Sequence, residues 1–340
     1  MKINTLYNIF SKLLISRYLR SLTFLCAFLF LGFNGFGQNP TVDIQGEPAT
    51  VNTIAEYTVT VVFSEGVNGF DQSDVVVVNG SVTTFIPLSF SDYSVGITPS
   101  GAQGNITIDI PDDSATAILG GAGNTAAAQA TTLFDNIQPS VVISSAVGSP
   151  TNTNPIPITI TFSEAVTGFV LGDIGVTNGT AGNFGGTGTT YTADITPAAD
   201  GTVTINVAAG VASDGAGNVN TAATPYSRVY DGTGPSVVIS SAVGSPTNTN
   251  PIPITITFSE AVTGFVLGDI GVTNGTAGNF GGTGTTYTAD ITPAADGTVT
   301  INVAAGVASD GAGNVNTAAT PYSRVYDGTG PSVVISSAVG

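Results

Sequence analysis

Histidine and tryptophan are absent from this chain of 340 residues, and cysteine occurs once, as Cys26. Only six basic residues occur, against 23 acidic ones. Four of the six lie in the first 37 residues, as Lys2, Lys12, Arg17 and Arg20. The rest of the chain has no histidine, cysteine or lysine with which to build a Ser-His-Asp triad, a Cys-His or Ser-Lys pair, a Schiff base or an ordinary zinc site. We therefore expect a chain that is not an enzyme.

The acidic side chains have almost no positive partners. Residues 38–340 hold all 23 acidic residues and only two arginines, Arg228 and Arg324, which gives a net charge of −21 (2 − 23). Two arginines cannot form the basic surface that a phosphate backbone or an anionic membrane requires. The sequence therefore excludes nucleic acid as a partner.

The first 37 residues have the pattern of an export signal. Basic residues precede the apolar run "SLTFLCAFLFLGF", and the segment contains no acidic residue. The small residues of "GFGQ" predict cleavage after Gly37, which would leave a secreted, extracellular chain with no membrane insertion. An uncleaved anchor is the alternative, although the run is short for a full membrane span. Cys26 follows Leu25, where a lipoprotein signal would have a small residue, so lipid attachment is not expected.

The remaining sequence predicts an all-β protein. Short runs of Val, Ile and Thr alternate between clusters of turn residues, and no helical periodicity is present. Seven short strands are expected in residues 139–234, which is typical of an antiparallel sandwich. They are 141–146, 156–163, 173–178, 180–185, 189–196, 202–208 and 220–230. The glycine-rich "GNFGGTGTT" at 182–190 is expected to be a hairpin loop, because it lacks the lysine and the following helix of a phosphate-binding loop.

A sequence repeat indicates the domain organisation. The sequence from Pro139 returns at Pro235, a period of 96 residues (235 − 139), and starts again at Pro331. An earlier stretch is a diverged copy, in which "VVFSEGVNGF" matches "ITFSEAVTGF". A period of this length suits one domain rather than one turn of a solenoid. The predicted parts are a signal peptide at 1–37, a diverged domain at 38–138, two identical repeats at 139–234 and 235–330, and the start of a further repeat at 331–340.

The phrases "FSEAVTGF", "DIGVTNG" and "YTADITPAADGTVTINVAAGVASDGAGN" resemble tandem bacterial immunoglobulin-like (Ig-like) modules of large secreted or surface adhesins. The resemblance covers residues 40–340. It implies seven-stranded sandwiches that act as a spacer or stalk in cell adhesion at the cell surface, with neighbouring repeats as partners. It also implies stalks that depend on calcium.

Two other functions stay open. A glycan- or matrix-binding module would need exposed aromatic side chains, and Tyr226 is the best candidate in each repeat, although an edge-strand tyrosine is the simpler interpretation. The repeats could also be accessory to a catalytic domain beyond Gly340. Carboxylate pairs of the glycosidase type are present, but identical active sites in tandem on a sandwich without a cleft are not expected.

Acidic residues are expected to meet where one domain follows another. If the strands run alternately up and down, Glu260 and Asp310 lie at the pole where the second repeat begins, next to Asp231 of the connecting "YDGTGP". Carboxylates this close repel one another unless a cation binds them, and calcium takes six to eight oxygen ligands in flexible geometry. The sequence therefore predicts calcium at this junction. The corresponding acids of the first repeat are Asp135, Glu164 and Asp214, and Asp173, Asp269 and Asp327 are further possible ligands.

Turn chemistry and solubility are the alternative explanation, because Asp and Gly are favoured in turns for backbone reasons. One comparison favours the metal. In the diverged domain, "LGGAGN" aligns Gly120 with Asp214 and Asp310, and no domain precedes this one in the array. Loss of the acid at a position without a junction is expected if the acid serves the junction.

Overall fold

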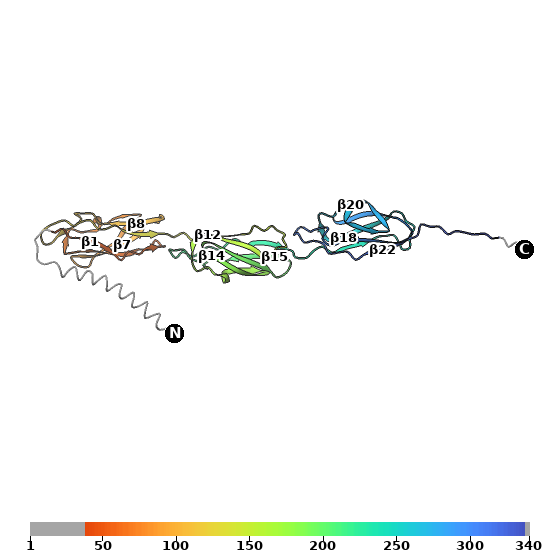
Figure 1. Ribbon diagram of the computed structural model, residues 1–340. Coiled ribbons are helices and arrows are strands. Elements are labelled where there is room, and N and C mark those ends of the chain that lie inside the picture. Colours follow the sequence, from red (N-terminus) through yellow and green to blue (C-terminus); the bar gives the residue numbers. More distant parts are fainter. Residues whose placement is uncertain (1–37, 337–340) are drawn as a thin grey trace, which may run out of the picture. The chain divides into compact units, whose positions relative to one another are not determined.

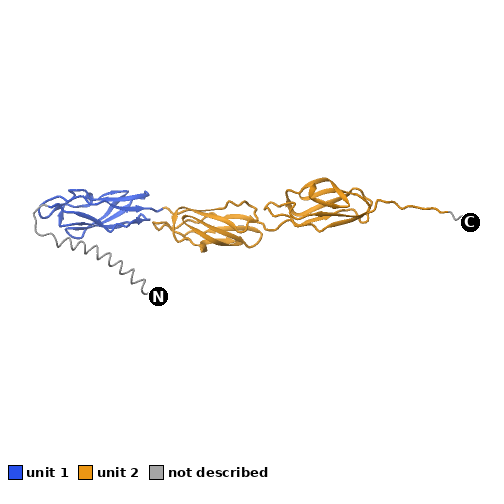
Figure 2. Ribbon diagram, in the orientation of Figure 1, with its two compact units in different colours: residues 1–136 blue, residues 137–340 orange. Residues whose placement is uncertain are grey.

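The computed structural model describes residues 38–336 (Figure 1). The predicted signal peptide lies outside the described residues. The chain divides into two compact units, unit 1 at 1–136 and unit 2 at 137–340 (Figure 2). Nearly all regular structure is β-strand, as predicted, and three 3-10 helices of three residues each are the exceptions among the described residues.

Unit 1 is a sandwich of two four-stranded sheets, with strand orders β1-β3-β7-β6 and β2-β10-β8-β5. All strand pairs are antiparallel except β2 with β10, which is parallel. A two-stranded ribbon of β4 and β9 closes one end. The strands are β1 (Val42–Gln45), β2 (Thr50–Val51), β3 (Tyr57–Phe63), β4 (Val67–Asn68), β5 (Val76–Val78), β6 (Gly80–Pro87), β7 (Asp92–Pro99), β8 (Gly104–Asp109), β9 (Thr116–Ala117) and β10 (Ala130–Phe134), with η1 (Gln72–Asp74) before β5.

Unit 2 contains two copies of one antiparallel sandwich. In the first repeat, one sheet has the order β11-β12-β14 and the other β13-β15-β16. These elements are β11 (Val141–Ser144), β12 (Ile156–Val166), η2 (Leu171–Asp173), β13 (Ile174–Thr177), β14 (Gly179–Pro197), β15 (Gly201–Val207) and β16 (Tyr226–Tyr230). The second repeat has β17 (Val237–Ser240), β18 (Ile252–Val262), η3 (Leu267–Asp269), β19 (Ile270–Thr273), β20 (Gly275–Pro293), β21 (Gly297–Val303) and β22 (Tyr322–Tyr326) in the same arrangement.

Strand β14 replaces two of the expected strands. Its first half turns back on its second half. Two contacts show this: the Asn183 amide donates to the Asp194 carboxylate at 2.9 Å, and the Phe184 ring stacks on Tyr191 with centroids 5.7 Å apart. The hairpin expected here is present, but its turn is tighter than a loop of 182–190. With β14 folded in this way, the first sheet has the composition of the four-stranded sheet of unit 1.

The last expected strand is shorter than predicted. Residues 220–225 form no strand, and β16 begins at Tyr226. The reason is Asn220, which is 1% exposed and bonds the surrounding loop instead of a neighbouring strand. Its Oδ1 accepts from the backbone N–H of Ala212 at 2.9 Å, and its Nδ2 donates to the Ala208 carbonyl at 2.8 Å.

Each sandwich has its own hydrophobic core, built from the inward face of alternating strands. In β12, Ile158, Ile160 and Phe162 are 2%, 0% and 2% exposed. Phe162 meets Phe169 edge-on at 5.3 Å. The hydroxyl of Tyr191 donates to the Val166 carbonyl, so this buried polar group is satisfied. These cores hold the loops at the two ends of each sandwich in place.

Candidate functional site: an acidic group between the repeats

The strand order brings three acidic residues of unit 2 together. Glu260 lies near the end of β18, Asp310 lies in the loop between β21 and β22, and Asp231 follows β16 of the first repeat. Each offers a carboxylate oxygen, and these atoms all lie within 4.8 Å of one another. This is the placement that alternating strands predict. Such a group could hold a metal ion.

The loop that carries Asp310 is organised around its carboxylate. Oδ1 accepts from the backbone N–H groups of Ala312, Gly313 and Asn314 at 2.8, 2.8 and 2.9 Å. Oδ2 accepts from the Asn314 side-chain amide at 2.9 Å. Burial raises the pKa of Asp310, but the hydrogen bonds together outweigh burial, and the pKa is lowered overall. Asp310 is therefore held as a carboxylate although it is only 6% exposed.

Glu260 experiences the opposite effect. Burial raises its pKa first, and the negative charges of Asp231, Asp310 and Asp200 raise it further. The two acids thus lie in one group with pKa values shifted in opposite directions. Three carboxylates that lie this close repel one another when ionised, and a bound cation would offset that repulsion.

Direct contacts also join the two repeats around the acidic group. The Asn314 amide donates to the backbone carbonyl of Asp231 at 2.8 Å. A Cβ placed on Gly311 would lie 3.7 Å from Pro150, and one on Gly313 would lie 3.6 Å from the Asn152 amide. The "DGAGN" loop of the second repeat therefore lies in van der Waals reach of the first repeat. These contacts were not predicted from the sequence.

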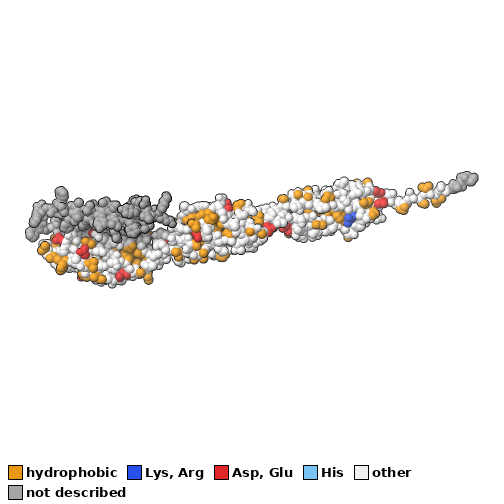
Figure 3. Space-filling view, turned by 90° about the horizontal axis from the view of Figure 1, so that it is seen from below, with side chains coloured by type: hydrophobic (Ala, Val, Ile, Leu, Met, Phe, Trp, Pro, Cys, Tyr) orange, Lys and Arg blue, Asp and Glu red, His pale blue; other side chains and the backbone are white. Residues whose placement is uncertain are grey.

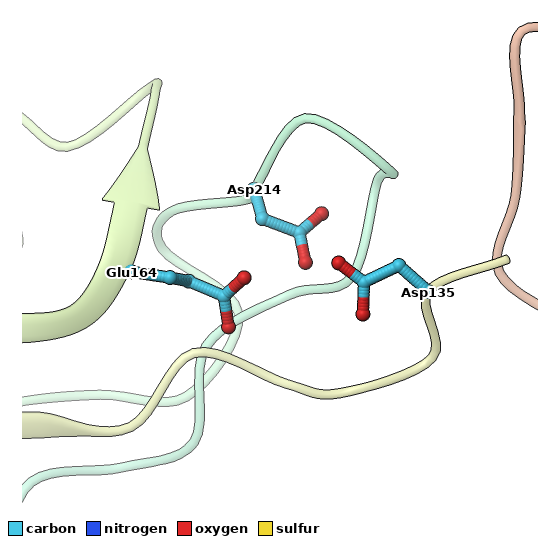
Figure 4. Close-up of side chains that lie close together, drawn as sticks. All are labelled: Asp135, Glu164 and Asp214. Atoms are coloured by element: carbon cyan, nitrogen blue, oxygen red, sulfur yellow. The ribbon is translucent and has the colours of Figure 1, made fainter. Parts of the chain in front are cut away.

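The first repeat carries Glu164 and Asp214 at the corresponding positions, and Figure 4 labels them together with Asp135. Asp214 is buried, and its Oδ1 accepts from the backbone N–H groups of Ala216 and Asn218 at 2.8 and 2.9 Å. Asp135 belongs to unit 1, where it follows β10. The predicted junction of Asp135 with Glu164 and Asp214 stays a prediction.

The further acids have other partners. Asp173 and Asp269 end the short helices η2 and η3, where their carboxylates accept from the backbone N–H groups of Val170 and Val266 at 2.8 Å. They act as helix caps and are not part of the acidic group of the second repeat. Asp327 follows β22 and accepts from the Thr329 backbone N–H at 3.2 Å.

A buried asparagine fixes the alignment of unit 1 with the repeats. In unit 1, Asn124 accepts from the backbone N–H of Ala115, nine positions earlier. In the first repeat, Asn220 accepts from Ala212, eight positions earlier, and from Val211. The backbone N–H of Asn124 donates to the Ala115 carbonyl, whereas that of Asn220 donates to the Ala212 carbonyl. The loop of unit 1 therefore contains one additional residue.

The expected alignment of Gly120 with Asp214 is therefore wrong. Thr116 pairs with Asn68, as Ser213 pairs with Thr167, so the next residue, Ala117, takes the position of Asp214. Matching the letters "GAGN" pairs Asn124 with Asn218, whereas its structural counterpart is Asn220. The conclusion that unit 1 lacks the acid is unchanged.

Tyr226 does not offer a free aromatic face. The Arg228 guanidinium lies 4.2 Å from the centroid of its ring, and the Tyr226 hydroxyl is directed to the Ser145 carbonyl at 3.5 Å. Arg228 also donates to the Val147 carbonyl at 3.0 Å. These contacts support the interpretation of Tyr226 as an edge-strand tyrosine.

The space-filling view shows acidic side chains at the boundary between the two repeats and again at the far end of the second repeat (Figure 3).

In the described residues no helix is long and apolar enough to cross a membrane.

The sequence matches the bacterial Ig-like domain family over residues 37–133, 135–229 and 231–325. The chain therefore belongs to this family, in three tandem copies, and the predicted resemblance and fold class are confirmed. A search of curated proteins found no match.

Similar solved structures come from bacterial proteins. The Escherichia coli adhesin FdeC is 13% identical, with a TM-score of 0.42, and 88% of this chain and 100% of that one are covered. Yersinia pseudotuberculosis InvD is 13% identical, with a TM-score of 0.40 and coverage of 85% and 98%. Invasin, described as a bacterial integrin-binding protein, is 14% identical, with a TM-score of 0.33 and coverage of 78% and 56%. At these identities the activities of the neighbours do not transfer to this chain.

Proposed function

We propose that this chain is a non-catalytic spacer of a secreted, cell-surface adhesin-like protein, in which calcium stiffens the junctions between domains. The proposed domains are 38–138, 139–234 and 235–330, after a cleaved signal peptide. The family and the tandem arrangement support a spacer, since residues 37–325 are three tandem copies of one domain family. The lack of histidine, lysine and cysteine after residue 37 supports a non-catalytic role.

The observation that carries the calcium part is the group of Asp231, Glu260 and Asp310 between the repeats. Its members come from both repeats, so an ion bound by all three would link them. Carboxylates and loop carbonyls are the hard oxygen ligands that calcium prefers. Calcium would supply the positive charge that the group lacks, and it would fix the linker relative to the second repeat.

A thermal melt of residues 38–340 tests this proposal. Excess calcium is expected to raise the melting temperature of the parent above its value in chelator, since calcium binds the folded junction and not the unfolded chain. At a calcium concentration about 100 times Kd, one such site adds about 2.7 kcal/mol to the free energy of unfolding. The variant Asp231→Asn with Glu260→Gln keeps the shape of both side chains and is expected to lose the part of the increase that this junction contributes.

The matched control is Asp327→Asn, which makes the same change in the same "YDGTGP" sequence after the second repeat. Its response to calcium should equal that of the parent. Equal melts of the parent in calcium and in chelator would contradict the calcium junction, and the acids would then be turn formers and solubilising charge.

A further inference from the structure

The turn between β14 and β15 ends in an aspartate that holds the linker leaving the same repeat. Asp200 Oδ1 accepts from the backbone N–H of Gly232 at 2.7 Å, and Oδ2 accepts from the hydroxyl of Thr233. The Thr233 hydroxyl and then the Gly232 N–H lower the pKa of Asp200. Asp200 is exposed, so it is these bonds that hold its side chain against the linker.

The second repeat has the same arrangement. Asp296 Oδ1 accepts from the backbone N–H of Gly328 at 2.6 Å, and Oδ2 accepts from the Thr329 hydroxyl. The contact is therefore a property of each repeat, and it does not depend on the following domain.

Unit 1 uses a neutral side chain at this position. The Gln103 amide donates to the Asn136 side chain. In the reverse amide orientation its oxygen accepts from the Asn136 backbone N–H at 3.2 Å and its nitrogen donates to the Asp135 carboxylate at 3.1 Å. Asn136 is the second residue after β10, as Gly232 is the second residue after β16. What the three modules share is thus a hydrogen bond to the start of the linker, and not a charge.

The linker between the repeats is held from its other side by the second repeat. The Asn314 amide bonds the Asp231 carbonyl, and the Thr317 backbone N–H donates to the Pro235 carbonyl at 2.9 Å. A Cβ on Gly234 would lie 2.4 Å from the Val315 carbonyl oxygen, so the linker packs closely against that repeat. Both ends of the linker are therefore fixed by direct hydrogen bonds.

We propose that Asp200 is a positioning residue for the junction. By fixing the first linker residues on its own repeat, it sets the direction in which the linker leaves and hence where Asp231 lies relative to the acids of the second repeat. Gln103 and Asp296 do the same in their own modules. This inference rests on the proposed spacer function, but it concerns the linker hydrogen bonds and requires no bound cation.

Distance measurements between spin labels on residues 38–340 test the proposal. The labels are placed at Val142→Cys and Val238→Cys, which are equivalent positions in the two repeats and are each 63% exposed. No other cysteine is present, because Cys26 lies in the removed segment. In chelator, the parent should give one narrow distance distribution. Asp200→Ala should lose it and give a broad one, whereas Asp200→Asn, which keeps an oxygen for the linker N–H, should keep it.

The control is Asp296→Ala, which makes the same change in an identical repeat beyond the measured junction. It should leave the distribution narrow, because it removes the same hydrogen bonds from the linker that follows the second repeat. A narrow distribution for Asp200→Ala would overturn the proposal. So would a broad one for Asp200→Asn, since the charge of Asp200 and not its hydrogen bond would then matter. Absence of a calcium effect on the melt would contradict the calcium junction and leave this result standing.

Discussion

Two acids of one group differ in what their ionisation does to stability. Asp310 is stabilised as a carboxylate by hydrogen bonds, whereas Glu260 is ionised against burial and three neighbouring negative charges. A lowered folded-state pKa gives stability that is lost as the pH falls through that pKa. A raised carboxyl pKa does the reverse, because its cost is absent below the unfolded-state pKa and complete above the folded-state pKa.

Replacing Glu260 by glutamine should therefore have a pH-dependent effect. In chelator, Glu260→Gln is expected to raise the melting temperature at about pH 7 and to change it little at about pH 3.5, since the cost sets in as the pH rises past the ordinary value of 4.5. In calcium at about pH 7 the same variant should lower the melting temperature, because a ligand is lost.

The exposed Glu47→Gln in unit 1 is the control, and neither change is expected there. The variant Glu260→Gln and the parent both contain Asp310, so the difference between their melting temperatures at each pH reports the effect of Glu260. An equal effect of Glu260→Gln at the two pH values would contradict this explanation.

At the scale of the element, β14 shows how one glycine determines a strand. Gly186 has φ +107°, and a Cβ there would lie 2.3 Å from the Thr190 carbonyl oxygen of the returning half. Only glycine allows both this backbone conformation and this approach. The tight hairpin therefore depends on Gly186, and Gly282 has the same role in the second repeat.

Gly186→Ala should destabilise the first repeat by about 1–3 kcal/mol through backbone strain, with the steric overlap in addition. Because the second repeat has the same sequence and is unchanged, calorimetry should show its melting transition separate from that of the first repeat. Gly182→Ala is the matched control, since nothing lies within 4 Å of a Cβ there. It should be neutral or stabilise by up to about 1 kcal/mol. Equal melts of the two variants would show that the hairpin tolerates a wider turn.

At the scale of the whole molecule, net charge dominates. Residues 38–340 carry 23 acidic side chains and two arginines. Arg228 donates to the Val147 carbonyl and lies over the Tyr226 ring. Arg324 donates to the Val243 carbonyl and lies over the Tyr322 ring. Repulsion among the acidic side chains opposes the compact state.

Added sodium chloride should therefore stabilise the chain in chelator. Raising it from about 0.01 M to about 1 M shortens the Debye length from about 30 Å to about 3 Å, which screens the repulsion. The melting temperature, followed by circular dichroism, should rise over this range. With calcium bound the increase should be smaller, because part of the charge is already neutralised. A melting temperature that falls with salt would show that attractive ion pairs outweigh the repulsion.

The sequence by itself determined the class of fold and the number of modules. Alternating Ile158, Ile160 and Phe162 specify a half-buried strand, since period two is a local property, and the 96-residue repeat specifies equal domains (235 − 139). The meeting of Glu260 with Asp310 also followed from the sequence, because antiparallel strands of known order fix which loops share a pole.

Only the tertiary structure decided which side chains hold the linker and how the loops align. The hydrogen bond of Asp200 to Gly232 joins residues 32 positions apart, and no local pattern encodes that approach. The alignment of Ala117 with Asp214 depended on the pairing of Thr116 with Asn68 and of Ser213 with Thr167, which letter matching cannot reveal. Local periodicity is written into the chain, whereas contacts between distant turns exist only after the two sheets have packed.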